Sequence, residues 1–226
     1  VLKTLTRAVA PGMTTADLDG MARDTIREFD AVSAFLNYRG FPAQICVSIN
    51  DEVIHGIPGA RMIVPGDIVS LDVGVRYRGF HGDNAEAVLV GVSDPSQVEL
   101  VETTRRALAA GIAAVAPGRH LSDVSHAVEQ VARAGGCGVV REFVGHGIGR
   151  ELHEEPQVPN YGRPGRGPVM RPGMVFCIEP MLTRGSPSIR VLDDGWTVVT
   201  RDGAPAAHCE HQVAVTSEGV EVLTPR

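Results

Sequence analysis

Three carboxylates inside apolar runs have the clearest potential for chemistry in this chain. Asp72 lies in IVSLDVGV, Glu179 in MVFCIEPM and Glu210 in AAHCEHQVAV. Runs of this kind fill buried strands, and a buried anion without a partner costs several kcal/mol. Each carboxylate therefore requires a cation nearby. One solution is a separate salt bridge for each, to an arginine such as Arg76, Arg78 or Arg171.

A shared divalent cation explains more of the pattern with a single assumption. Asp83 in GFHGDN and the glycine-flanked His146 in VGHGIGRELHEE are further donors. Oxygen ligands with one imidazole suit manganese, iron, cobalt or a catalytic zinc better than structural zinc or calcium. Because four carboxylates are too many for one ion, two of them can bridge a pair of ions about 3.5–4 Å apart, as in dinuclear hydrolases. The predicted ligands are Asp72, Asp83, His146, Glu179 and Glu210.

Two other histidines are candidates for catalysis rather than for metal binding. His153 follows His146 in the same motif, and His55 lies in INDEVIHGIP. An imidazole beside a metal centre can donate a hydrogen bond to the negative charge that develops on a carbonyl oxygen. The remaining histidines are expected to be ordinary core or surface residues; they are His81, His120, His126, His208 and His211.

The elements that must position these side chains occur twice in the chain. The tripeptide Ala-Pro-Gly at 10–12 recurs at 116–118, each time before a helix-like pattern, and PGDIVSLD at 65–72 corresponds to PGMVFCIE at 172–179. Both pairs are separated by nearly the same interval, which indicates an internal duplication. We therefore expect a single catalytic domain. Its two pseudo-equivalent halves would cover about 1–105 and 106–226.

Local patterns predict an α+β fold in which helices cover one face of a mostly antiparallel sheet. Thr14-x-x-Asp17 and Ser96-x-x-Glu99 are typical of helix starts, and Asp193-Asp194-Gly195 is typical of a hairpin turn. The expected helices run to about residues 29 and 115. The expected strands cover about 44–50, 67–75, 84–91, 139–144, 173–182 and 206–216.

Composition limits the classes of protein to which this chain can belong. The 226 residues are 43% hydrophobic and carry a net charge of −6, which argues against broad electrostatic binding to nucleic acid or to an anionic membrane. No apolar run reaches 18 residues, and residues 1–10 lack the features of a secretory signal, so we expect a cytoplasmic protein. The four cysteines form no CxxC pair and are expected to be reduced thiols; they are Cys46, Cys137, Cys177 and Cys209.

Five motifs in this order carry a resemblance to a known family. They are SINDEVIHGIP (48–58), DVGVRYRGFHGD (72–83), GHGIGRELHEEPQV (145–158), IEPM (178–181) and EH (210–211). Together they resemble type I methionine aminopeptidase, in its short bacterial form, over essentially the whole chain. The resemblance implies the duplicated pita-bread fold with a dinuclear metal centre between its halves. It also implies a metal-dependent exopeptidase that removes the initiator methionine from nascent proteins and prefers a small second residue.

The resemblance also implies a role for each matching residue. Asp72, Asp83, His146, Glu179 and Glu210 match the ligands of two divalent ions (Co, Mn, Fe or Zn), with Asp83 and Glu210 as the bridges. His55 and His153 match the catalytic histidines that face the substrate, and Glu179 matches the ligand that also carries a proton. Tyr38, Phe41, Cys46 and Trp196 match the methionine pocket. The implied partners are nascent polypeptides with a free N-terminal methionine and, transiently, the ribosome, for a monomer that reads no nucleic acid sequence and binds no membrane.

The chain also departs from the family pattern, and two other functions remain open. Asn84 stands where a small hydroxyl residue is common and Gln212 where threonine is usual, so the surroundings of the metals are expected to differ. Phe41 replaces a frequent tyrosine and Leu152 a frequent aromatic residue in the pocket. The alternatives are an X-Pro aminopeptidase or prolidase-like enzyme and a non-catalytic pita-bread binding module. The second would be expected to have lost ligands.

Overall fold

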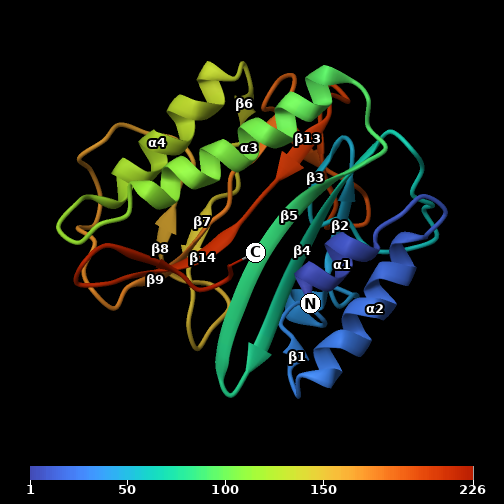
Figure 1. Ribbon diagram of the computed structural model, residues 1–226, viewed down its shortest axis with the longest axis horizontal. Coiled ribbons are helices and arrows are strands. Elements are labelled where there is room, and N and C mark those ends of the chain that lie inside the picture. Colours follow the sequence, from blue (N-terminus) through green and yellow to red (C-terminus); the bar gives the residue numbers. More distant parts are fainter. Residues whose placement is uncertain (226) are drawn as a thin grey trace.

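The computed structural model describes residues 1–225, in which two helices, a run of antiparallel strands, two more helices and a longer run of strands follow one another (Figure 1). The helices are α1 (Leu2–Ala8), α2 (Thr15–Glu28), α3 (Pro95–Ala113) and α4 (Leu121–Ala134), with a 3-10 turn at Tyr38–Gly40. The strands of the first half are β1 (Val32–Ser33), β2 (Cys46–Ile49), β3 (Glu52–Ile54), β4 (Asp67–Tyr77) and β5 (Phe80–Val90). Those that follow are β6 (Gly138–Val139), β7 (Gly145–Gly147), β8 (Glu154–Val158), β9 (Val175–Ile178), β10 (Met181–Thr183), β11 (Ile189–Val191), β12 (Val198–Thr200), β13 (Ala206–His208), β14 (His211–Val215) and β15 (Val220–Val222).

Helix α2 begins where the sequence predicts, and α3 begins slightly earlier. The Thr14 hydroxyl accepts a hydrogen bond from the Asp17 backbone N–H, and the Asp17 carboxylate accepts one from the Thr14 N–H. In α3 the cap is Asp94 rather than Ser96, because the Asp94 carboxylate accepts from the Ser96 N–H and Pro95 occupies the first helical position. Proline suits that position because its missing N–H would have no partner there. None of the described helices is long and apolar enough to cross a membrane.

The strands form small antiparallel sheets, and the described pairings confirm the expected α+β class. Strand order is β1-β4-β2 with β5 beside β4 in one sheet, and β15-β14-β9-β7-β8 in another. Two three-stranded sheets, β13-β10-β6 and β11-β12-β3, complete the set. The predicted hairpin is formed by β11 and β12.

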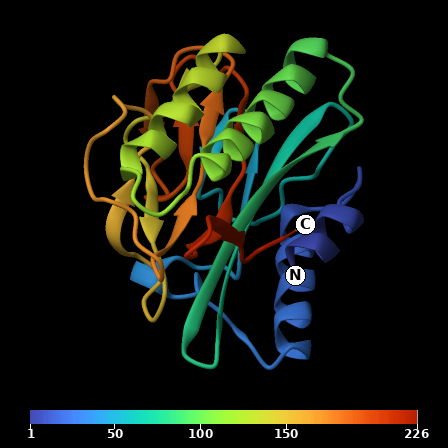
Figure 2. The ribbon, with the colours of Figure 1, turned by 60° about the vertical axis from the view of Figure 1, so that its left-hand side comes forward.

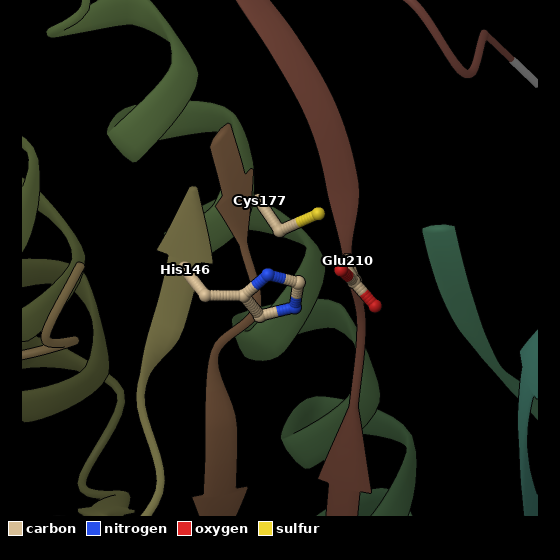
Figure 3. Close-up of side chains that lie close together, drawn as sticks. All are labelled: His146, Cys177 and Glu210. Carbon is tan, nitrogen blue, oxygen red and sulfur yellow. The ribbon is translucent and has the colours of Figure 1, made fainter. Parts of the chain in front are cut away.

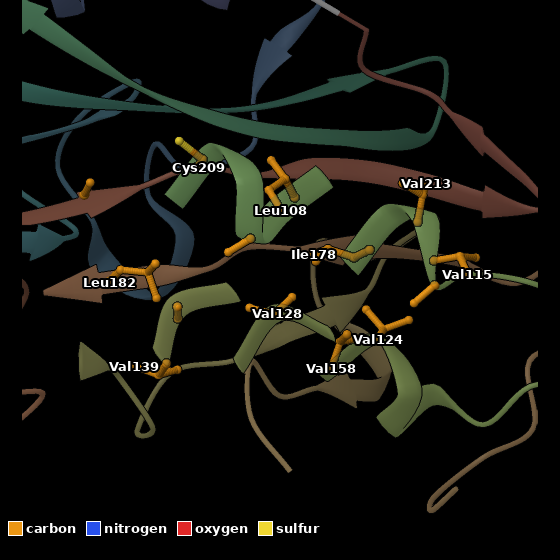
Figure 4. Packing of buried hydrophobic residues seen from close by; sticks show 14 of the residues in the cluster. Leu108, Val115, Val124, Val128, Val139, Val158, Ile178, Leu182, Cys209 and Val213 are labelled. Carbon is orange, nitrogen blue, oxygen red and sulfur yellow. The ribbon is translucent and has the colours of Figure 1, made fainter. Parts of the chain in front are cut away.

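Helices α1 and α2 cover one part of the strands, and helices α3 and α4 cover another (Figure 2). Helices α1 and α2 pack on β2 and β4, where Val69, Leu71 and Val73 face them in one apolar cluster. Because side chains alternate along a strand, Asp72 faces the opposite side. Helices α3 and α4 pack on the other large sheet, and Figure 4 shows Val124 and Val128 of α4 in the same cluster as Ile178 of β9.

Candidate metal centre

The first two predicted ligands, Asp72 and Asp83, lie on neighbouring strands of one hairpin. Asp72 on β4 pairs with Ala85 on β5, and Asp83 on β5 pairs with Gly74 on β4. The two aspartates are therefore offset by one diagonal step on the same face of the sheet, within reach of each other. Asp83 is buried, with 4% of its surface exposed. The hairpin register thus brings the two carboxylates to one place.

Glu179 and Glu210 lie where two predicted strands are interrupted. The sequence predicts continuous strands over 173–182 and 206–216, but the structure ends β9 at Ile178 and β13 at His208 before β10 and β14 begin. Pro180 has no N–H to donate to a strand ladder. Pairing of Ile178 with His211 and of Met181 with His208 keeps one register across both interruptions, so Glu179 and Glu210 lie opposite each other.

Two hydrogen bonds join this interruption to the hairpin that carries the aspartates. The Glu210 backbone N–H donates to the Ala85 carbonyl over 2.9 Å. The Asp83 N–H donates to the Gln212 side-chain oxygen over 3.2 Å. Gln212, which departs from the usual threonine, therefore contacts a predicted ligand directly. These bonds bring Glu210 to the face that carries Asp72 and Asp83.

The ring of His146 on β7 presents its Nε2 atom to the same group of carboxylates. Its Nδ1 lies 2.9 Å from the Gly147 carbonyl, which can only accept a hydrogen bond. Nδ1 is therefore the protonated nitrogen, and Nε2, 3.6 Å from a Glu179 carboxylate oxygen, keeps its lone pair. The glycines around His146 are required by close packing. A Cβ at Gly145 would lie 2.3 Å from the Cys177 carbonyl oxygen, and one at Gly147 would lie 2.2 Å from that of Glu155.

The donor set fits a cation. Asp72, Asp83 and Glu210 have carboxylate oxygens within 4.8 Å of one another. Each of these residues also has one buried oxygen with no hydrogen-bond partner in the described chain. The alternative of separate salt bridges is not supported, since no ion pair found in residues 1–225 links these three carboxylates or Glu179 to an arginine. Buried oxygens of this kind are stabilised by a shared cation.

The crowding of acids changes their protonation. Burial, together with the neighbouring carboxylates, raises the pKa of Asp72, Glu179 and Glu210 well above the usual range. Burial raises the pKa of Asp83 to about 7. Burial also lowers the pKa of His146, which keeps its ring neutral and able to bind a metal ion.

These shifts predict that the metal-free protein loses stability as the pH rises from 6 to 8. A carboxyl whose pKa is raised by folding contributes stability at low pH, and this contribution is lost as the pH rises through its folded pKa, here about 7 for Asp83. This residue alone would contribute about 1 kcal/mol to the change, which corresponds to a few degrees in Tm. Thermal melts at both pH values, with and without Mn²⁺, measure it.

Manganese should abolish this pH dependence because a cation favours the charged carboxylates. The matched variant Asp83→Asn, which cannot titrate at this position, should show a smaller pH dependence without metal. A metal-free protein that melts at the same or a higher temperature at pH 8 would contradict the assignment.

The two catalytic candidates, His55 and His153, lie beside this cluster. His55 follows β3 in a left-handed backbone conformation (φ 59°), and its ring packs against Phe143 and Trp196. His153 Nδ1 lies 2.8 Å from the Tyr38 hydroxyl, and its ring centre is 4.2 Å from that of His146. Burial lowers the pKa of both His55 and His153 to about 4. Both rings are therefore neutral at pH 7.

One cavity of about 390 Å³ unites all of the predicted site residues. Metal-ligand candidates line one part of it, and an aromatic wall lies beside them, where the Phe41 and Trp196 ring centres are 5.1 Å apart. The predicted pocket residues that line it are Tyr38, Phe41, Cys46 and Trp196. Residues that the sequence analysis did not single out also line it; they are Phe35, Arg39, Ile54, Glu142, Phe143, Val144 and Gln157. Residues 142–144 directly precede Gly145 and His146. This closeness in the sequence to a predicted ligand was the signal that could have pointed to them.

A cavity lined by carboxylates and a histidine, in a fold of antiparallel strands covered by helices, defines a metal-dependent hydrolase. The chain belongs to metallopeptidase family M24, whose model matches residues 1–217. Within this family it is similar to bacterial methionine aminopeptidases. It is 46% identical to the methionine aminopeptidase of Clostridium acetobutylicum over 99% of this chain and 90% of that protein. It is 49% identical to methionine aminopeptidase 1 of Mycobacterium tuberculosis over 99% of this chain and 86% of that protein.

Solved structures agree with this grouping and confirm the predicted pita-bread fold. The methionine aminopeptidase of Thermotoga maritima superposes with a TM-score of 0.98 at 43% identity, covering 100% of this chain and 91% of that one. The prolidase of Pyrococcus furiosus superposes with a TM-score of 0.75 at 19% identity, covering 99% of this chain and 59% of that one. The second likeness shows a shared fold alone. The resemblance stated from the sequence motifs is confirmed, and family membership implies divalent metal ions.

Proposed function

We propose that this chain is a methionine aminopeptidase, a hydrolase that removes the N-terminal methionine from polypeptides with a small second residue. The observation that carries the proposal is a single cavity in which unpartnered buried carboxylates lie beside two neutral histidines and an aromatic wall. Full-length relatives at 44–49% identity support it. An X-Pro aminopeptidase shares the fold, but the relatives at this identity do not favour it.

The proposed metal residues are Asp72, Asp83, His146, Glu179 and Glu210, which would together hold two divalent ions. Bound ions would supply Lewis acidity toward the scissile carbonyl and would lower the pKa of a water molecule. A non-catalytic binding module has no need of such a set. We infer Mn, Fe, Co or Zn because oxygen donors with one imidazole suit these ions.

The chain's own residues then divide the remaining tasks. His55 and His153 are neutral, so each can donate a hydrogen bond to the oxygen on which negative charge develops. The Tyr38 hydroxyl at His153 Nδ1 orients that ring. Glu179, whose pKa is raised by burial, can accept a proton and deliver it to the leaving amine. We assign His55, His153 and Glu179 as the catalytic residues.

The methionine side chain is placed against the apolar part of the cavity. Phe41, Cys46 and Leu152 are buried there with Phe35, and Trp196 packs on Phe41. This lining fits an unbranched thioether, whereas the free α-amino group meets the carboxylates. The site would therefore recognise both the side chain and the α-amino group of the first residue.

Specificity tests the proposal, and only N-terminal methionine should be released. Met-Ala-Ser should be cleaved about 10- to 200-fold faster than Leu-Ala-Ser, because a change of one group in an apolar pocket is worth about 1–3 kcal/mol. Formyl-Met-Ala-Ser should be refused more firmly, because acylation removes the amino group's charge. Amino-acid release from these peptides and from Ala-Pro-Ser, under one metal condition, measures the order.

Three outcomes would contradict the assignment. Preferential release of alanine from Ala-Pro-Ser would assign the chain to the X-Pro aminopeptidases. Equal cleavage of the formylated and free peptides would refute recognition of the α-amino group. A set of uncleaved peptides with added Mn²⁺, Fe²⁺ and Co²⁺ would favour the binding module.

We further propose that residues 1–226 act as one catalytic domain of two pseudo-equivalent halves, about 1–105 and 106–226. The net charge of −6 argues against broad electrostatic binding to nucleic acid, and we propose a cytoplasmic protein that meets nascent chains and the ribosome only transiently and reads no nucleic acid sequence. We propose a monomer without membrane attachment. Sedimentation at several protein concentrations tests the monomer directly.

A further inference from the structure

Cys177, which the sequence analysis expected to be an ordinary reduced thiol, lies beside the proposed metal centre. Donor atoms of Cys177, His146 and Glu210 all lie within 4.8 Å of one another, and all three residues are buried. Figure 3 shows the Cys177 sulfur and the His146 ring both directed toward the Glu210 carboxylate. The three residues come from β9, β7 and the interruption between β13 and β14.

Strand alternation explains why the thiol points to this place. Phe176 and Ile178 on β9 face the apolar cluster under α3 and α4, so Cys177 between them faces the cavity side. Cys177 pairs with Gln212, and Glu210 lies two residues before Gln212 on the same face. Cys177 is therefore a diagonal neighbour of Glu210 across the strand pair.

Two of the three groups also present unused donor atoms. Glu210 is only 2% exposed, and its Oε1 has no hydrogen-bond partner among residues 1–225. His146 keeps its Nε2 lone pair because its Nδ1–H donates to Gly147.

We propose that Cys177, His146 and Glu210 form a binding site for a soft or borderline divalent cation of the Zn²⁺ or Cd²⁺ class. The inference rests on the proposed function, because it shares two side chains with that metal centre. When the ion binds, the S–H bond breaks, a sulfur–metal bond forms and the proton passes to water. One sulfur, one nitrogen and one oxygen favour such ions over Mn²⁺, which prefers oxygen donors.

Cobalt is the spectroscopic probe, because a Co²⁺–thiolate bond gives a near-ultraviolet charge-transfer band that oxygen and nitrogen donors do not give. Anaerobic wild-type protein titrated with Co²⁺ should show this band. Cys177→Ser and Cys177→Ala should lose it. The two control variants, Cys46→Ser and Cys209→Ala, should keep the band. Cys46 lines the same cavity, and Cys209 faces the apolar cluster. Circular dichroism establishes that each variant is folded.

Calorimetric titration with Cd²⁺ and Mn²⁺ gives the second readout. Cys177→Ser should weaken Cd²⁺ binding at least about tenfold more than Mn²⁺ binding, since loss of even an outer partner of a metal ligand costs about 10- to 100-fold. Absence of the band in wild-type protein that still shows Mn²⁺-dependent methionine release would overturn this inference and leave the proposed function intact. Loss of the band only in Cys46→Ser, or equal losses of Cd²⁺ and Mn²⁺ affinity, would also overturn it.

Discussion

Removal of divalent metal should lower methionine release by at least about a thousandfold, and Mn²⁺, Fe²⁺ or Co²⁺ should restore it. A bound ion contributes several kcal/mol of charge stabilisation, and about 1.4 kcal/mol corresponds to a factor of ten in rate. In this chain the effect should be near complete. Without a cation, Asp72, Asp83, Glu179 and Glu210 have raised pKa values and line one part of the cavity with protonated or mutually repelling acids.

The measurement uses Met-Ala-Ser release before chelation, after chelator and bound metal are removed by desalting, and after each ion is added back. Elemental analysis of the same samples gives the number of ions per chain, and titration of the apoprotein should saturate activity at two. Circular dichroism of the apoprotein separates loss of metal from loss of fold. Full turnover by folded protein with no bound metal would refute the metal centre.

Glu179→Gln should lower kcat by at least about a hundredfold at saturating Mn²⁺. Glutamine has nearly the same shape, but it removes one ligand charge and the proposed proton carrier together, and general acid–base catalysis alone contributes about 10²- to 10⁴-fold. Because the loss falls on the chemical step, KM should change less than kcat. Steady-state kinetics with Met-Ala-Ser, with metal content measured in parallel, tests this expectation.

The control for this variant is Glu151→Gln, which removes an exposed carboxylate that belongs to the His146 motif but does not line the cavity. Its kcat should stay close to that of the wild type. Wild-type turnover by Glu179→Gln would mean that another group carries the proton. A variant that regains full activity only at higher Mn²⁺ concentration would show that Glu179 serves as a ligand without a role in proton transfer.

Local sequence patterns predicted much of the fold, and the residues predicted for the site line one cavity. A capping box marks the start of α2, and apolar runs mark β4, β5 and the strands around Glu179 and Glu210. These signals are local, because capping depends on residues three apart and strand burial on alternation along one segment. Carboxylates within such runs were informative because an unpaired buried charge is costly, so they pointed to one shared centre. The chemical roles assigned to them remain predictions.

Long-range pairing decided what local patterns could not. The interruptions at Glu179 and Glu210 depend on two strand pairs that keep one register across them, and the hydrogen bond from Glu210 to Ala85 joins the interruption between β13 and β14 to strand β5. The same pairing gives Gln212 a hydrogen bond to the Asp83 backbone. It also places the Cys177 thiol beside His146. Residue types and their order determined which chemistry this chain can perform, whereas only the register between distant strands decided which atoms meet, because a shift of one residue turns every side chain of a strand to the other face.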